Sequence, residues 1–255
     1  MKLDTFCTRL DDRLQTADFA DIDGNANGLQ VGPSDGRSID HAAFAVDAAQ
    51  ATIDRAIDAN ADVLVTHHGL FWEGTDRLTG YSYDRVRSLI TGELALYVAH
   101  LPLDSHQELG NAAGVGDILE IEDREPFAEY SGEYVGQQGR LDTPQTVDTI
   151  VETLSTELEG AESVHALPFG TEEVETVGIV TGAGVDYLEP AAIAGLDVLI
   201  TGEGKQYVHH VARELEMNLV LAGHYATETT GVKALKSLVE EWGLETTYVS
   251  HPMRL

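Results

Sequence analysis

The stretch DVLVTHHG, residues 62–69, joins a run of aliphatic residues to two adjacent imidazoles, His67 and His68. The aliphatic run predicts a buried strand, and ligand sites in open α/β sheets lie beyond the carboxyl ends of the strands. Neighbouring side chains on an extended backbone point in opposite directions, so the two histidines could serve two metal ions rather than chelate one. A His-His pair alone is weak evidence for a metal site, and its weight depends on what the fold brings near it.

Two further stretches place an imidazole at a predicted strand end with a carboxylate shortly after it. In HLPLDSH, Asp104 follows the strand that ends at His100, and a carboxylate can bridge two cations. In GHYATE, Glu228 lies four positions after His224, so a helix that begins at once would present both side chains on one face. The expected ligand set is three imidazoles and two carboxylates: His67, His68, Asp104, His224 and Glu228. This mixture suits zinc, iron, manganese, cobalt or nickel.

The residues around these stretches predict alternating strands and helices. In the first half of the chain, hydrophobic periodicity predicts strands at 42–47, 62–66 and 94–100, with helices at 48–60 and 83–93 between them. A βαβ order of this kind favours a mainly parallel sheet covered by helices.

The second half of the chain echoes the first. A stretch rich in Gly and polar residues at 125–145 predicts a strand or hairpin, with Thr143 and Pro144 as the N-cap and first residue of the next helix. Beyond it, DVLITGEG shares Asp, Val, Leu, Thr and Gly in register with DVLVTHHG, which indicates an internal duplication. The alternative is convergence, because buried parallel strands share a composition rich in Val, Ile and Leu.

These patterns together predict an α/β fold of two related halves, whose mainly parallel sheets face each other across a dinuclear metal cleft. The N-terminal half, with the His-His pair and the aspartate, is expected at 1–125, and the C-terminal half, with the histidine and glutamate ligands, at 126–255. An interleaved arrangement of the two halves is left open.

The composition describes a very acidic chain. Its 44 acidic residues stand against 15 basic ones, for a net charge of −29, and molar salt would screen the resulting repulsion. Acidity together with scarce lysine favours a halophilic source, and the lack of a basic run argues against a nucleic-acid partner. No apolar stretch approaches the ~20 residues of a membrane helix, and no signal peptide is recognisable. Cys7 is the single cysteine, which excludes thiolate ligation and fits a cytoplasmic location.

Five blocks of the sequence resemble one known family, lie in that family's order and span most of the chain. They are NANGLQVG (25–32), THHGLFW (66–72), HLPLDSHQELGNA (100–112), TGEGKQYVHHVARE (201–214) and AGHYATE (222–228). The chain resembles the short form of the GTP cyclohydrolase 1 type 2 homologues, the Nif3-like proteins. The resemblance implies two divalent metal ions per protomer, held between two related α/β halves, and a toroidal homohexamer. It also implies that the five residues named above are the ligands, with Asp104 and Glu228 as candidate bridges.

Other residues of these blocks are candidates for supporting roles. His100, Glu203 and His210 match family positions close to the metal centre, where they could orient ligands or move protons. A purely structural role, with each side chain satisfied by backbone groups, is equally open for all three. Asn27, Gly28 and Gln30 are expected to shape a loop beside the site, with a turn at positive φ as the alternative role of Gly28.

Two hypotheses about function follow from a dinuclear centre. Two close cations can lower the pKa of a bridging water and stabilise negative charge on a substrate, which favours a metal-dependent hydrolase that uses a metal-bridged hydroxide. Its substrate would be a small molecule, either in a reaction of the GTP-cyclohydrolase type or with a phosphoester or amide bond. The alternative is a metal-binding protein without turnover, acting as a chaperone, a metal store or a regulatory scaffold.

Overall fold

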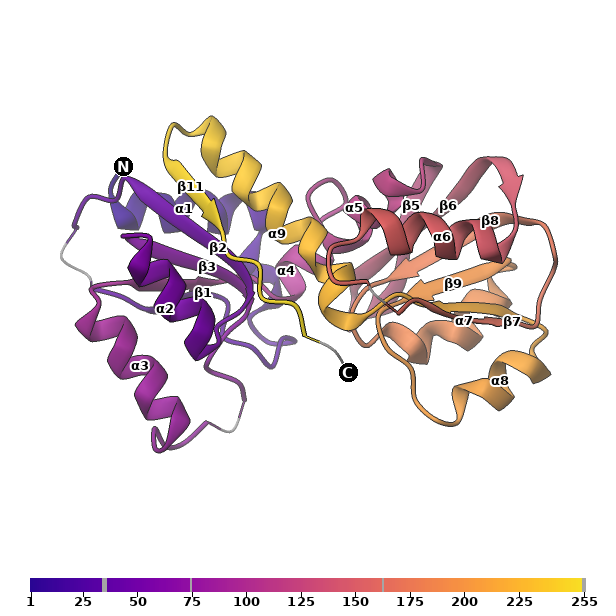
Figure 1. Cartoon of the computed structure of the whole chain (residues 1–255), viewed down its shortest axis with the longest axis horizontal. Coiled ribbons are helices and arrows are strands. Elements are labelled where there is room, and N and C mark those ends of the chain that lie inside the picture. The colour runs from indigo at the N-terminus through magenta and orange to yellow at the C-terminus, as the bar shows by residue number, and fades with distance from the viewer. Residues whose placement is uncertain (34–35, 74, 162, 254–255) are drawn as a thin grey trace. The chain divides into compact units, whose positions relative to one another are not determined.

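The computed structural model describes residues 1–33, 36–73, 75–161 and 163–253. The structure divides into two compact units, and each unit is formed by two separate segments of the chain (Figure 1). The first unit comprises Met1–Leu103 and Val232–His251, and the second comprises Asp104–Gly231 and the C-terminal end from Pro252. Each unit contains one sheet built around parallel strands, so the predicted α/β fold with two mainly parallel sheets is confirmed. Within the described ranges, no helix is long and apolar enough to cross a membrane.

The sheet of the first unit has five strands in the order β1-β4-β3-β2-β11. Their bounds are Gly28–Val31 (β1), His41–Asp47 (β2), Val63–His68 (β3), Ala95–Val98 (β4) and Glu245–Tyr248 (β11). All neighbouring pairs are parallel except β1 with β4. The central strand β3 runs beside β2 in a register that places His68 opposite Asp47.

Helices cover both faces of this sheet. Their bounds are Leu3–Leu14 (α1), Thr16–Phe19 (η1, a 3-10 turn), Gln50–Asp58 (α2), Tyr81–Thr91 (α3) and His224–Glu241 (α9), of which α9 begins in the second unit and belongs to the first from Val232 onward. Ile53 of α2 and Leu89 of α3 pack in one apolar cluster with Leu64 of the central strand. Strand side chains alternate between faces, so Tyr97 lies on the opposite side, where its ring meets that of Phe6 in α1 with centroids 6.4 Å apart.

The sheet of the second unit has six strands in the order β5-β6-β8-β9-β10-β7. Their bounds are Ile121–Tyr130 (β5), Glu133–Gln145 (β6), His165–Pro168 (β7), Val174–Val180 (β8), Val198–Thr201 (β9) and Asn218–Leu221 (β10). The middle strands β8, β9 and β10 are parallel, whereas the antiparallel pair β5 and β6 forms the hairpin expected at 125–145.

The helix expected to begin at Pro144 begins later. Pro144 belongs to β6, which pairs with β8 as far as Gln145. Thr146 is the N-cap, and its side chain accepts a hydrogen bond from the backbone N–H of Thr149. The prediction was wrong because strand pairing extends the backbone through a local signal for a helix start.

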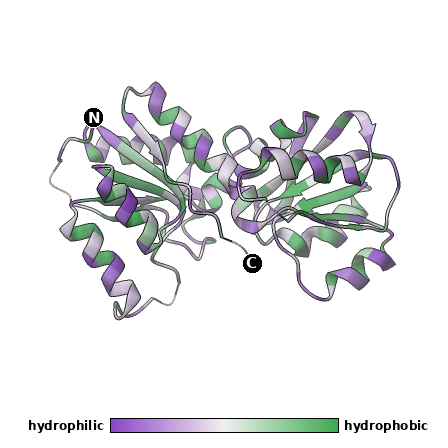
Figure 2. Cartoon of the chain, in the orientation of Figure 1, coloured by the Kyte–Doolittle hydropathy of each residue, from purple (hydrophilic) through white to green (hydrophobic). Residues whose placement is uncertain are grey.

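Helices also cover both faces of the second sheet (Figure 1). Their bounds are Asn111–Ile118 (α5), Val147–Glu157 (α6), Gly184–Tyr187 (η2), Leu188–Ile193 (α7) and Val208–Glu214 (α8), and the short helix Leu101–Asp104 (α4) lies where the chain passes from the first unit to the second. The core on one face joins Val115 of α5 and Ile150 and Leu154 of α6 to Val177 and Ile200 of the strands. Figure 2 shows the hydrophobic colour concentrated on the central strands of each unit.

The division into units differs from the predicted boundary after residue 125. Residues 104–125 belong to the second unit because α5 contributes to its apolar core. Val232–His251 return to the first unit because β11 pairs with β2.

Two aspartates play the same part in the two units. Asp62, just before β3, accepts two backbone N–H groups at the start of β2 with Oδ2, at 2.7 and 3.0 Å. Asp197, just before β9, accepts two backbone N–H groups at the start of β8 with Oδ2, at 2.9 and 2.8 Å. These are the aspartates of DVLVTHHG and DVLITGEG, so the repeated sequence corresponds to a repeated structural device.

Candidate metal centre

The carboxyl end of β3 presents His67 and His68 with each ring held by an acceptor at Nδ1. His67 is fully buried, and its Nδ1 lies 2.9 Å from the carbonyl oxygen of Ala99, directly after β4. Nδ1 of His68 lies 3.0 Å from Oδ1 of Asp47, its partner across the parallel ladder. Both contacts come from neighbouring parallel strands, so the sheet register itself orients the two rings.

The two adjacent histidines do not turn to opposite sides as an extended backbone predicts. Their ring centroids lie 4.6 Å apart. The alternation of side chains holds only while the backbone stays extended, and β3 ends at His68. The two rings therefore lie on the same side of the strand end, close to each other.

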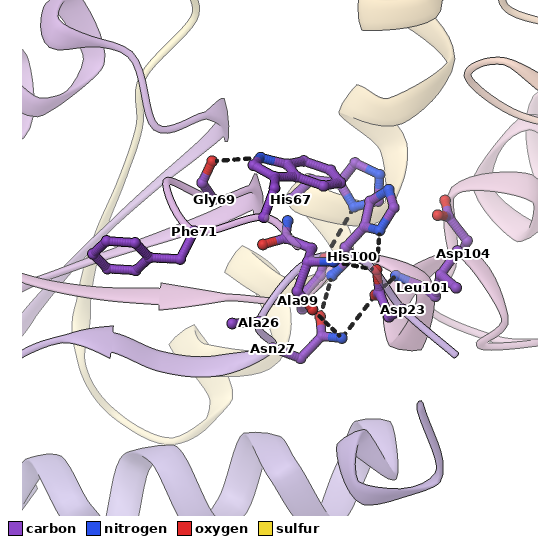
Figure 3. A network of polar contacts seen from close by, with 12 residues as sticks. Asp23, Ala26, Asn27, His67, Gly69, Phe71, Ala99, His100, Leu101 and Asp104 are labelled. Carbon is purple, nitrogen blue, oxygen red and sulfur yellow. Dashed lines mark hydrogen bonds and ion pairs between the residues drawn. The ribbon is translucent and has the colours of Figure 1, made fainter. Parts of the chain in front are cut away.

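His100 joins them from the end of β4. Its Nδ1 lies 2.8 Å from Oδ1 of Asp23, whose side chain is almost completely buried (Figure 3). Asp23 also accepts hydrogen bonds from the backbone N–H of Asn25 and Leu101 and from the Asn27 amide. Burial alone would raise the pKa of Asp23, but the hydrogen bond and charge of His100, together with the Asn25 and Asn27 bonds, outweigh it and lower that pKa. The carboxylate therefore stays ionised and holds the His100 ring.

This pattern sets the tautomer of the rings. A carbonyl oxygen can only accept, so the proton of His67 sits on Nδ1 and the lone pair on Nε2. A carboxylate acceptor favours the same tautomer for His68 and His100. A histidine whose Nδ1–H is bonded to a carbonyl or carboxylate is the usual form of a metal ligand. One donor atom from each of His67, His68 and His100 lies within 4.8 Å of the others, so the group could hold a metal ion.

The second unit contributes a histidine between two carboxylates. His224 is the first residue of α9, and Glu228 follows one turn later, as the sequence spacing predicts. Nε2 of His224 lies 3.1 Å from Oε1 of Glu228, and its Nδ1 lies 3.2 Å from Oε2 of Glu203. Burial lowers the pKa of His224, but the hydrogen bonds and charges of Glu228 and Glu203 outweigh burial and raise that pKa to about 9. Two carboxylates thus favour positive charge at this point, as a cation site requires.

A glycine makes room for this group at the carboxyl end of β8. Gly182 has φ +60°, and a Cβ placed there would collide with Oε1 of Glu228 and lie 3.2 Å from Nε2 of His224. The preceding residue, Thr181, donates to Oδ1 of Asp104 at 3.4 Å, and the Asn111 amide donates to the same oxygen at 2.8 Å. Thr181 therefore contacts Asp104, while Gly182 leaves the space that the side chains of Glu228 and His224 occupy.

The predicted site residues thus fall into one group in each unit. His67 and His68 lie with His100 in the first, whereas Asp104, His224 and Glu228 lie around the β8 end in the second. Two of the three supporting candidates contact a predicted ligand: Glu203 contacts His224, and the ring of His100 packs against that of His67. The third, His210, lies on α8 and packs against His209 with ring centroids 5.5 Å apart.

Sequence reasoning missed three residues that shape these groups: Asp23, Asp47 and Gly182. Asp47 ends a predicted strand, but the register that places it opposite His68 is set by the pairing of β2 with β3. Gly182 was visible as a glycine after a strand, but its contact with Glu228 depends on a residue far along the chain.

Known proteins resemble this chain over its whole length. The model of the family Duf34/NIF3 (NGG1p interacting factor 3) matches residues 1–252. A GTP cyclohydrolase 1 type 2 homolog from Halobacterium salinarum is 49% identical over 256 residues and is covered completely, as is this chain. Two solved structures match this chain over 100% of both chains. The structural-genomics protein ybgI, of unknown function, is 31% identical with a TM-score of 0.92. TTHA1606 from Thermus thermophilus is 34% identical with a TM-score of 0.88.

Proposed function

Because the chain belongs to the Duf34/NIF3 family, we propose that it is a dinuclear metal-binding protein that acts as a metal-dependent hydrolase. The observation that carries this proposal is the fixed orientation of the imidazoles. Each of His67, His68 and His100 has Nδ1 bonded to a carbonyl or carboxylate oxygen, and this orientation makes Nε2 the coordinating atom of the proposed ligands His67 and His68.

The chemistry of the side chains fits a borderline divalent ion. Imidazole nitrogens and carboxylate oxygens are the ligands of zinc, iron, manganese, cobalt and nickel sites, and the raised pKa of His224 marks a place that favours a cation. Following the resemblance to the Nif3-like proteins, we propose that His67, His68, Asp104, His224 and Glu228 would hold two such ions, with Asp104 and Glu228 as the candidates for bridging. When bound, the ions act as Lewis acids toward a substrate and a water molecule.

Residues of the chain orient these donors. Asp47 holds the ring of His68, and Glu203 holds the ring of His224. The Asp23 carboxylate fixes the ring of His100 through Nδ1, so Nε2 of His100 is the atom at which this residue would accept or donate a proton. His100 thereby has the geometry of a proton carrier beside the ligands His67 and His68.

The substrate class is proposed from the relatives. The Halobacterium salinarum protein is named a GTP cyclohydrolase 1 type 2 homolog, and ring opening of a purine is one hydrolysis that a dinuclear centre can support. Phosphoester and amide hydrolysis use the same chemistry and belong in the same assay panel.

We also propose that the protein assembles as a toroidal homohexamer. This proposal follows the resemblance to the Nif3-like proteins, and exposed apolar side chains such as Tyr81 (74%), Ile90 (64%) and Ile193 (80%) are available for contacts between copies. Sedimentation in molar salt measures the number of protomers, and a monomer at micromolar concentration would contradict the assembly.

Elemental analysis of protein kept in high salt tests the metal centre. We expect about two ions per protomer in the wild type and fewer in His68→Ala and Glu228→Ala. The matched control is His165→Ala, because His165 is exposed on the edge strand β7 and should leave the metal content unchanged. Less than one ion in the wild type after incubation with zinc, iron or manganese would refute the proposal.

Activity is tested on the metal-loaded protein with GTP, phosphodiesters and peptides. Turnover that disappears in Glu228→Ala, with the fold intact, supports the hydrolase. Full metal content without turnover of any of these compounds, together with transfer of the metal to acceptor proteins, would instead favour the metal chaperone or store.

A further inference from the structure

A cavity of about 990 Å³ opens in the first unit beside the Asp23–His100 pair. Its walls come from α1, from the segment between η1 and β1, and from the loop that follows His68. Small-molecule sites usually occupy about 300–1,000 Å³, so the cavity is large enough for a nucleoside-sized compound.

The two loops that form its walls are bonded to each other. The backbone N–H of Ala26 donates to the carbonyl of Phe71 at 3.1 Å, and that of Glu73 donates to the carbonyl of Gly24 at 2.7 Å. Gln30 adds hydrogen bonds to both loops with its side-chain amide. The cavity is therefore a formed feature of the unit.

Trp72 supplies an aromatic surface in this cavity. The residue is 40% exposed, so part of its ring is accessible to a ligand. Its indole N–H donates to the carbonyl of Gly69 at 3.1 Å, and its ring meets that of His100 at a centroid distance of 5.0 Å. Trp72 is thus held in place and connects the cavity to the proposed proton carrier.

The polar groups of the cavity select for hydrogen-bond donors. Asp11, Asp21, Asp23 and Glu73 line it; Asp21 and Glu73 are exposed, whereas the side chain of Asp23 is buried and bonded to His100. No Lys or Arg is among the described lining residues. Asn25, only 3% exposed, accepts from Gln30 through Oδ1, while its Nδ2 has no hydrogen-bond partner among the described residues. A ligand that carries N–H groups would match the exposed carboxylates of this wall, whereas a phosphate would meet their negative charge.

We propose that this cavity binds the planar part of the substrate, an uncharged nitrogen heterocycle with N–H donors, stacked on Trp72. The inference rests on the proposed function, because it places the heterocycle next to His100. It also predicts a direction of preference: a nucleoside should bind better than its phosphorylated form.

Calorimetric titration of the metal-loaded protein with adenosine tests the site. Purine riboside, which lacks the amino donor, and AMP, which adds a phosphate, serve as the matched ligands. We expect adenosine to bind more tightly than either. Trp72→Ala should weaken adenosine binding by roughly 5- to 100-fold, as expected for loss of one base–aromatic stack, and Trp72→Phe should retain part of the affinity.

The role of charge is tested with Asp21→Asn. This substitution should reduce the difference in binding affinity between adenosine and AMP. The same difference should shrink as salt is raised, because salt screens exposed charges. Trp242→Phe is the control for tryptophan replacement, since Trp242 packs against Phe6 and is not among the residues that line the cavity.

Three results would overturn the proposal: no adenosine binding at millimolar concentration, equal binding in Trp72→Ala, or tighter binding of AMP than of adenosine. Metal content separates this failure from that of the proposed function. A protein that retains two ions but binds no adenosine loses only the heterocycle site, whereas a protein without metal loses the hydrolase whether or not adenosine binds.

Discussion

Gln30 joins the loop that follows the His-His pair to the loop that contains Asn25. Its Oε1 accepts from the backbone N–H of Leu70 at 2.8 Å and of Phe71 at 3.2 Å. Its Nε2 donates to Oδ1 of Asn25 at 2.8 Å and to the carbonyl of Ala26 at 2.7 Å. We predict that Gln30→Ala destabilises the protein and weakens metal binding through the loop after His68.

The expected loss follows from the hydrogen bonds removed. Each contributes about 0.5–1.5 kcal/mol, and water replaces part of this because Gln30 is only half-buried. Four bonds then give about 2–3 kcal/mol in the free energy of unfolding. Removal of a group that orients ligands typically lowers metal affinity by about 10- to 100-fold, and we expect the lower end because Gln30 acts through the backbone.

Guanidinium chloride unfolding of the metal-free protein measures the first quantity, and competition with a chelator measures the second. Gln30→Glu keeps the two acceptor contacts but sets a carboxylate oxygen against Oδ1 of Asn25 and the carbonyl of Ala26, so it should destabilise the protein at least as much as Gln30→Ala. Gln206→Ala is the matched control, because Gln206 is exposed and should change stability by less than about 0.5 kcal/mol. A Gln30→Ala protein as stable as this control would refute the reasoning.

Three other outcomes are expected. Gly182→Ala should lose more metal affinity than Gly195→Ala: both glycines have positive φ, but only at Gly182 would a Cβ collide with Glu228, so equal metal affinity in the two variants would contradict the assigned role. Burial, and after it the charge of Asp11, raises the pKa of Cys7 to about 12. We therefore expect Cys7 to react with a thiol reagent at pH 8 only after unfolding, and fast labelling of the native protein would disprove its burial. The free energy of unfolding should rise with salt because the net charge of −29 repels itself in dilute buffer, and a salt-independent unfolding midpoint would argue against this adaptation.

Local patterns were sufficient for the parts of the site that depend on position along a strand or helix. Alternation of strands and helices identified β2, β3 and β4, and therefore the strand ends that carry His67, His68 and His100. The spacing of His224 and Glu228 predicted one helical face because α9 begins at His224. Pro144 shows the limit of such patterns: pairing of β6 with β8 overrode a local signal for a helix start.

The partners of the candidate ligands depended on contacts distant in the sequence. Asp23 meets His100 across 77 residues, and Asp47 meets His68 across 21. Neither contact leaves a periodic signal, because it arises from the sheet register and from the closing of a loop over the strand ends. The entry of the C-terminal segment into the first unit likewise depends on the pairing of β11 with β2.

The amino-acid sequence by itself determined the α/β alternation, the acidic charge and the residues that could bind metal, because each is a property of composition or of short-range spacing. Only the tertiary structure decided which nitrogen of each imidazole is held, which carboxylates hold it, and that Trp72 lines a cavity beside His100. Those properties are relations between side chains from separate elements, and they exist only after the strands have taken their register and the loops have closed over them.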